Sequence, residues 1–111
     1  MATPSWSAQV VTTRVSLDQL AAKYPLQQFK VGRCGLASCE GQWGDAECAK
    51  AERFVKLWRG SATDAERLQA DLVRHARKKH AARCRNAEAA TSPIEQPEPH
   101  VVFMAFWPKT G

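Results

Sequence analysis

The segment "HVVFMAFW", residues 100–107, is almost wholly apolar and is closed by Pro108. It is too short to cross a bilayer, which takes roughly 20 apolar residues. Its apolar residues do not alternate with polar ones, so the pattern predicts either a strand buried on both faces or a hydrophobic segment that docks on a partner protein. In the docking alternative the contact residues are Val101, Val102, Phe103, Phe106 and Trp107.

The nine residues before this segment, "TSPIEQPEP" at 91–99, contain three prolines. Such a composition predicts an extended linker. We therefore expect a small cysteine-stapled domain over 1–90, a linker over 91–99 and an apolar docking segment over 100–111. The docking interpretation makes other protein subunits of a larger assembly the expected partners.

The middle of the chain predicts two helices. Asp45 can cap a first helix over 45–59, and "TDAE" at 63–66 is a capping-box pattern that opens a second helix over about 64–87. A short turn at Gly60 makes them antiparallel neighbours. The expected hairpin core consists of Phe54, Val55, Trp58, Leu68 and Leu72.

The N-terminal stretch is rich in β-branched residues. Residues 7–17 predict a short strand, after which Ser16 can cap a two-turn helix that stops before Pro25. The predicted fold class is therefore α+β and mostly helical. It consists of an antiparallel helical hairpin, an irregular loop that holds the cysteines, and short terminal strands or extended segments.

Three of the four cysteines fall between residues 34 and 48, and the fourth is Cys84. The hairpin geometry places position 39 beside position 84, which favours a Cys39–Cys84 disulfide and leaves Cys34 to pair with Cys48. A zinc site is the alternative, in which Cys34 and Cys39 from the loop join His80 and Cys84 from one helical face. Unlinked buried thiols are a third alternative. The choice depends on the redox compartment, which the sequence leaves open.

The chain is basic, with 16 Lys and Arg against 11 Asp and Glu and a formal net charge of +5. This charge favours acidic partners. On the second predicted helix a basic stripe suits the phosphates of RNA or DNA, or an acidic protein surface, although a solvated helix face has the same pattern. The stripe consists of Arg67, Arg74, Lys78 and Arg85.

No phosphate-binding loop, dinucleotide-binding glycine pattern or nucleophile elbow is found in the sequence, which predicts a protein that is not an enzyme. Two functions remain as hypotheses. The first is a non-catalytic accessory subunit that helps to assemble or stabilise a larger complex and needs no cofactor. The second is a zinc-stabilised module that binds nucleic acid through the basic stripe.

Compartment is the remaining question. No transmembrane segment and no secretory signal are predicted. Residues 1–17 lack acidic residues and resemble an organelle transit peptide in composition, so an organelle and the cytoplasm both stay open.

Overall fold

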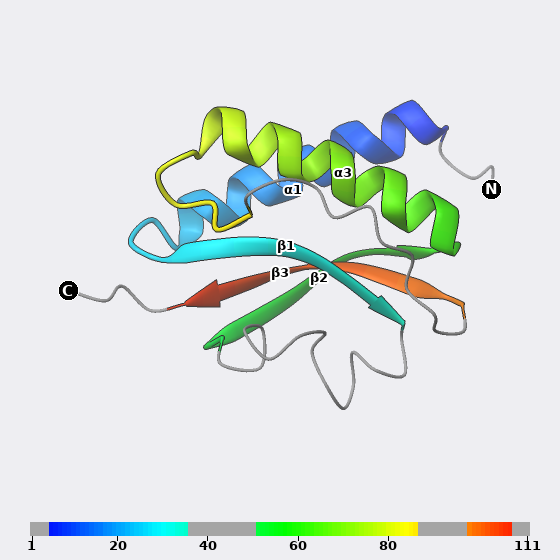
Figure 1. Cartoon of the computed structure of the whole chain (residues 1–111). Coiled ribbons are helices and arrows are strands. Elements are labelled where there is room, and N and C mark those ends of the chain that lie inside the picture. Colours follow the sequence, from blue (N-terminus) through cyan, green and yellow to red (C-terminus); the bar gives the residue numbers. More distant parts are fainter. Residues whose placement is uncertain (1–4, 36–50, 87–97, 108–111) are drawn as a thin grey trace.

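The computed structural model describes residues 5–35, 51–86 and 98–107. These residues form α1 (Trp6–Lys23), β1 (Gln28–Gly35), β2 (Arg53–Gly60), α3 (Ala62–Lys79) and β3 (His100–Trp107). The three strands make one sheet in the order β1-β3-β2, and β3 is antiparallel to both neighbours. Both helices lie on the same face of this sheet (Figure 1).

The apolar segment at residues 100–107 is the central strand, and all eight of its residues are buried. Val102, Met104 and Phe106 pack with the helices, whereas Val101, Phe103, Ala105 and Trp107 belong to a second apolar cluster. Because successive side chains of a strand point to opposite faces, a central strand covered on both faces is apolar throughout. The residues expected to dock on a partner are thus part of the chain's own core: Val101, Val102, Phe103, Phe106 and Trp107.

The predicted fold class, a mostly helical hairpin, is wrong because residues 53–60 form strand β2. Residues 45–50 of the expected first helix lie outside the described residues. Phe54, Val55 and Trp58 fit a helical stripe, but aromatic and β-branched residues suit a strand equally well. An apolar central strand needs a hydrogen-bonding neighbour on each edge, and β2 supplies the second one. Long-range pairing therefore decided the structure of this segment.

The predicted N-terminal strand over 7–17 is also wrong, since these residues lie within α1. The helix begins with Ser5, whose side chain accepts a hydrogen bond from the Ala8 backbone amide at 3.2 Å. Thr13, Leu17 and Ala21 follow one another at intervals of four residues and are buried. This spacing places them on the face of α1 that packs into the core.

The second predicted helix is present as α3, but it ends at Lys79 and not near residue 87. Its N-cap is Ser61, which accepts a hydrogen bond from the Asp64 amide at 3.2 Å. Leu68 and Leu72 are fully buried, as the apolar stripe predicted.

After α3 the chain runs along the outer edge of β1. The Phe29 amide donates to the Arg83 carbonyl at 2.9 Å, and the Arg85 amide donates to the Phe29 carbonyl at 2.7 Å. The side chain of Asn86 bonds both the amide and the carbonyl of Val31. These contacts give the edge of β1 a hydrogen-bonding neighbour.

Candidate interaction surface

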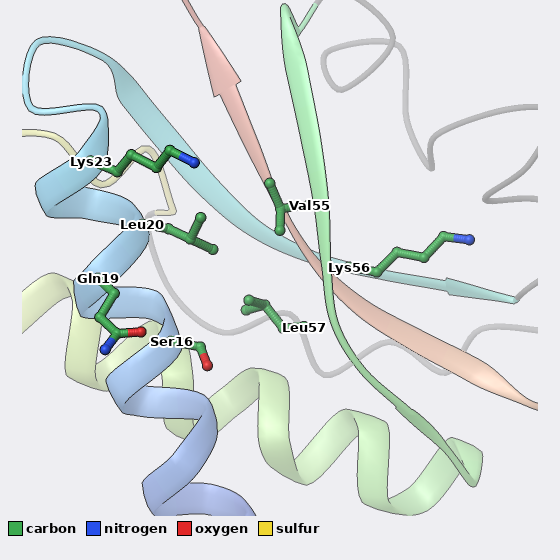
Figure 2. Close-up of a pocket in the computed structure, with 7 residues that line it drawn as sticks. All are labelled: Ser16, Gln19, Leu20, Lys23, Val55, Lys56 and Leu57. Carbon is green, nitrogen blue, oxygen red and sulfur yellow. The ribbon is translucent and has the colours of Figure 1, made fainter.

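A groove of about 360 Å³ lies between α1 and β2 (Figure 2). Leu20, Val55 and Leu57 form its apolar part and also pack against the main core. Lys23 reaches from α1 toward β2, whereas Lys56 points away from α1 (Figure 2). The complete lining consists of Ser16, Gln19, Leu20, Lys23, Val55, Lys56 and Leu57.

The groove follows an open strand edge. Within the part of the chain that the structure describes, β2 pairs with β3 alone, so its other edge has no strand neighbour. The register of β2 shifts between Lys56 and Trp58, which marks a β-bulge beside the groove. An unpaired edge offers backbone donors and acceptors to another extended chain.

The outward side of α1 has a group of six uncharged residues, with exposed Lys23 next to it at the C-terminal end of the helix. With a step of 100° per residue, six exposed residues fall within an arc of about 100° on this side. We call them the α1 outer face: Ala8, Val11, Thr12, Val15, Gln19 and Ala22. Val11 is 56% exposed and Val15 is 48% exposed, and they are neighbours four residues apart. Gln19 also lines the groove, so the two features are continuous.

The inner charges of α1 are turned toward α3. Arg14 donates to the carboxylate of Asp71, with Nε 2.8 Å from Oδ2. Asp18 Oδ1 lies 3.0 Å from His75 Nε2 and 2.8 Å from His80 Nε2, and Asp18 Oδ2 accepts from Lys79 Nζ at 2.9 Å.

This arrangement changes the acidity of Asp18. Partial burial alone would raise its pKa, but hydrogen bonds from His80, Lys79 and His75 outweigh burial and lower the pKa from 3.8 to about 2. Asp18 is thus an anionic link between the two helices at neutral pH. Its oxygens are occupied by neighbouring side chains, which is the geometry of a structural tie.

The basic stripe is only partly assembled. Arg67, Arg74 and Lys78 are exposed on α3, as expected. The guanidinium of Arg67 also stacks over the Trp6 ring, with Cζ 4.8 Å from the ring centroid. Its Nη1 lies 3.6 Å from Asp64 Oδ1. Arg85 lies beyond the end of α3, where its guanidinium covers the Trp107 ring at 4.4 Å. The stripe therefore consists of three residues of α3 and not four.

The positions of Cys34 and Cys84 in the structure differ from those that the predicted hairpin required. Cys84 has a free thiol, and its backbone forms an isolated parallel β-bridge with Phe29. Cys34, in contrast, is disulfide-bonded. The structure therefore does not form the predicted Cys39–Cys84 disulfide, whose geometric argument required the helical hairpin. Cys39 and Cys48 lie outside the described residues, so the Cys34–Cys48 pairing stays a prediction.

The four proposed zinc ligands are not brought together. Cys34 lies five residues along β1 from the Phe29–Cys84 bridge, which is about 16 Å of strand. The Nε2 atom of His80 instead contacts Asp18 Oδ1 at 2.8 Å. Among the residues that the structure describes, no group of three or more His, Cys, Asp and Glu side chains could hold a metal ion. Cys39, the fourth ligand in that set, is outside the described residues.

Burial raises the pKa of the Cys84 thiol, although Asn86 and Arg77 act in the opposite direction. A thiol with a raised pKa is protonated at neutral pH and is a poor nucleophile. The free cysteine is therefore a packing residue next to the main core.

The groove and the α1 outer face were not predicted from the sequence. The uncharged positions recur at helical spacing from residue 8 to residue 22, but this signal is visible only if the segment is assigned as a helix. The open edge of β2 had no signal, because its segment was assigned to a helix.

No protein-family model, curated protein or solved structure matches the chain. In the described regions, no helix combines the length and the apolar character needed to cross a membrane.

Proposed function

We propose that this chain is a non-catalytic interaction subunit that helps to assemble or stabilise a larger protein complex. Its binding surface is the side formed by the α1 outer face and the groove along β2. The observation that supports this most directly is the absence of charge from the α1 outer face, in a chain with 27 charged Lys, Arg, Asp and Glu residues.

The distribution of charge on α1 resembles that of a protein–protein interface. The centres of protein–protein interfaces are depleted of charged residues, and contiguous exposed apolar residues mark such sites. On α1 the side facing α3 has ion pairs, whereas the outer face has Val11 and Val15 at its middle. A helix that only covered its own core would be expected to have charged residues on its solvent side.

The test compares two aspartate substitutions. Val15→Asp places a charge at the middle of the α1 outer face, and the matched control Thr63→Asp places one at an exposed position of α3. Tagged variants are purified from the cells that produce the chain, and their complexes are measured by native mass spectrometry. We expect Val15→Asp to lose the partner subunits and Thr63→Asp to retain them, while both variants unfold at the wild-type temperature.

Equal retention of the partners by both variants would contradict the proposal. So would a wild-type chain that is isolated without any partner from those cells.

A second candidate function is binding of RNA or DNA through α3. Arg74 and Lys78 are exposed on one face of this helix, four residues apart. Among the described residues no carboxylate lies within ion-pair distance of either side chain, so both charges face solvent. Such a face reaches backbone phosphates and has no means of reading sequence.

If α3 binds nucleic acid in this way, the affinity for DNA should depend steeply on salt concentration. Binding of a labelled double-stranded DNA should weaken strongly between about 50 and 200 mM salt, and the double variant Arg74→Glu/Lys78→Glu should abolish it. Binding that survives both changes would exclude the phosphate-contact mechanism.

A further inference from the structure

We propose that the open edge of β2 binds an extended, acidic segment of the partner protein, which adds to the sheet as a fourth strand. This inference rests on the proposed function, because it names the kind of partner segment that the groove takes. Strand addition obtains its affinity from main-chain hydrogen bonds and its specificity from alternate side chains.

The open edge of β2 has room for an added strand beside α1. β1 and β2 are the two edge strands of the sheet, but only β1 has described residues along its outer edge. The edge of β2 instead borders the groove of about 360 Å³ against α1. An added strand would therefore have α1 on one of its faces.

The face of the added strand that is turned to α1 would lie mainly against apolar side chains. A side chain directed toward α1 would meet Leu20, Val55 and Leu57, which are partly buried apolar residues. Figure 2 shows Val55 and Leu57 turned to the side of α1. The inner face of the added strand is therefore mainly apolar, with Lys23 as the charged residue of α1 that also lines the groove.

The face of β2 that is turned away from α1 is basic at Lys56 and Arg59. Lys56 points away from α1 (Figure 2), and strand alternation places Arg59 on the same side as Lys56 beyond the bulge. Both are exposed, and no carboxylate of the described residues lies within ion-pair distance of them. Acidic side chains of an added strand would supply the missing countercharges, as opposite charges do across paired strands.

The same two residues argue against a second copy of this chain as the occupant. Pairing β2 with β2 of another copy would bring Lys56 and Arg59 close to their own counterparts. Like charges on neighbouring strands are destabilising, and basic edge residues are a common defence against such pairing. The site therefore selects a segment in which apolar and acidic residues alternate.

The experiment uses a fluorescein-labelled peptide of about ten residues that alternates Val and Glu, which matches the two faces of an added strand. Two control peptides have Lys in place of Glu, or N-methyl groups on alternate amides that block main-chain pairing. Binding to the full chain is measured by fluorescence anisotropy, and amide hydrogen exchange of β2 is followed by NMR.

We expect the Val-Glu peptide to bind and to slow exchange in β2, and both controls to bind at least about tenfold more weakly. The double variant Lys56→Glu/Arg59→Glu should lose about tenfold in affinity. The matched control Arg74→Glu/Lys78→Glu, which changes the net charge equally on α3, should bind as the wild type does.

Three results would overturn the inference: no binding of the Val-Glu peptide, equal binding of the N-methylated peptide, or an equal loss in the α3 variant. The proposed function is judged separately by the Val15→Asp variant. If that variant loses its partner subunits while the peptide does not bind, the interaction surface stands and only the identity of its occupant is wrong.

Discussion

Asp18 ties α1 to the C-terminal end of α3, because its carboxylate contacts His75, Lys79 and His80. Replacing it by Asn removes the negative charge that His75, His80 and Lys79 face. We expect Asp18→Asn to lower the free energy of unfolding by about 1 to 2 kcal/mol at neutral pH, as measured by chemical denaturation.

The pH dependence gives a sharper readout. The pKa of Asp18 is about 2 in the folded chain, below its ordinary value of 3.8. A carboxyl group with a depressed pKa stabilises the folded state above its ordinary pKa and loses that contribution as the pH falls toward the folded value. The difference between wild type and Asp18→Asn should therefore shrink between about pH 5 and pH 3. A difference that stays constant over this range would show that the charge of Asp18 does not stabilise the fold.

Position 32 leaves no room for a side chain, because Gly32 lies directly opposite Phe103 on the neighbouring strand. A Cβ atom at position 32 would be 2.5 Å from the end of the Phe103 ring, and this ring is buried. We expect Gly32→Ala to cost about 1 to 3 kcal/mol in denaturant unfolding. Combining it with Phe103→Leu should recover part of the loss if the ring is the obstacle. Additive losses in the double variant would rule out this contact as the cause.

At the scale of elements, β3 organises the molecule because it is paired along both edges and buried on both faces. Removing residues 100–111 takes away the only strand that joins β1 to β2 among the described residues. We expect the shortened chain to lose its cooperative unfolding transition in circular dichroism. Met104→Ala, a milder change at a fully buried site, should cost about 2 to 5 kcal/mol. A shortened chain that keeps a cooperatively folded pair of helices would contradict the central role of β3.

The elements also show how far local sequence reasoning extends. Helix α3 was predictable because its apolar stripe, including Leu68 and Leu72, has clear helical spacing, although the predicted capping box at 63–66 lies inside the helix and the N-cap is Ser61. The segment of β2 was not, since Phe54, Val55 and Trp58 match a helical period as well as they suit a strand. Helix α1 was missed for a related reason: its β-branched residues favour a strand locally, but burial of Thr13, Leu17 and Ala21 stabilises the helix.

The candidate site was less predictable than the fold. The basic residues Arg67, Arg74 and Lys78 could be placed on one helix face because they belong to a helix with clear periodicity. Arg85 could not be placed on that face, since α3 ends six residues before it and the Arg85 side chain stacks on Trp107. The groove depends on α1 lying beside β2. Because β2 begins 30 residues after α1 ends, only the folded chain brings these elements together.

At the scale of the whole molecule, the two sides of the chain differ in character. The outward face of α3 is basic, whereas the α1 outer face is uncharged and adjoins an open strand edge. A small domain with this division can bind a protein partner along α1 and β2 while its basic helix remains in solvent or contacts a polyanion.

The measurement that tests the central claim most directly is amide hydrogen exchange of the chain alone and in the complex isolated from its native cells. If the α1 outer face and the groove bind the partner, exchange slows in Arg53–Gly60 and in the exposed turns of Trp6–Lys23, and stays unchanged along Arg67, Arg74 and Lys78. Slower exchange confined to α3, with Arg53–Gly60 unaffected, would contradict the account.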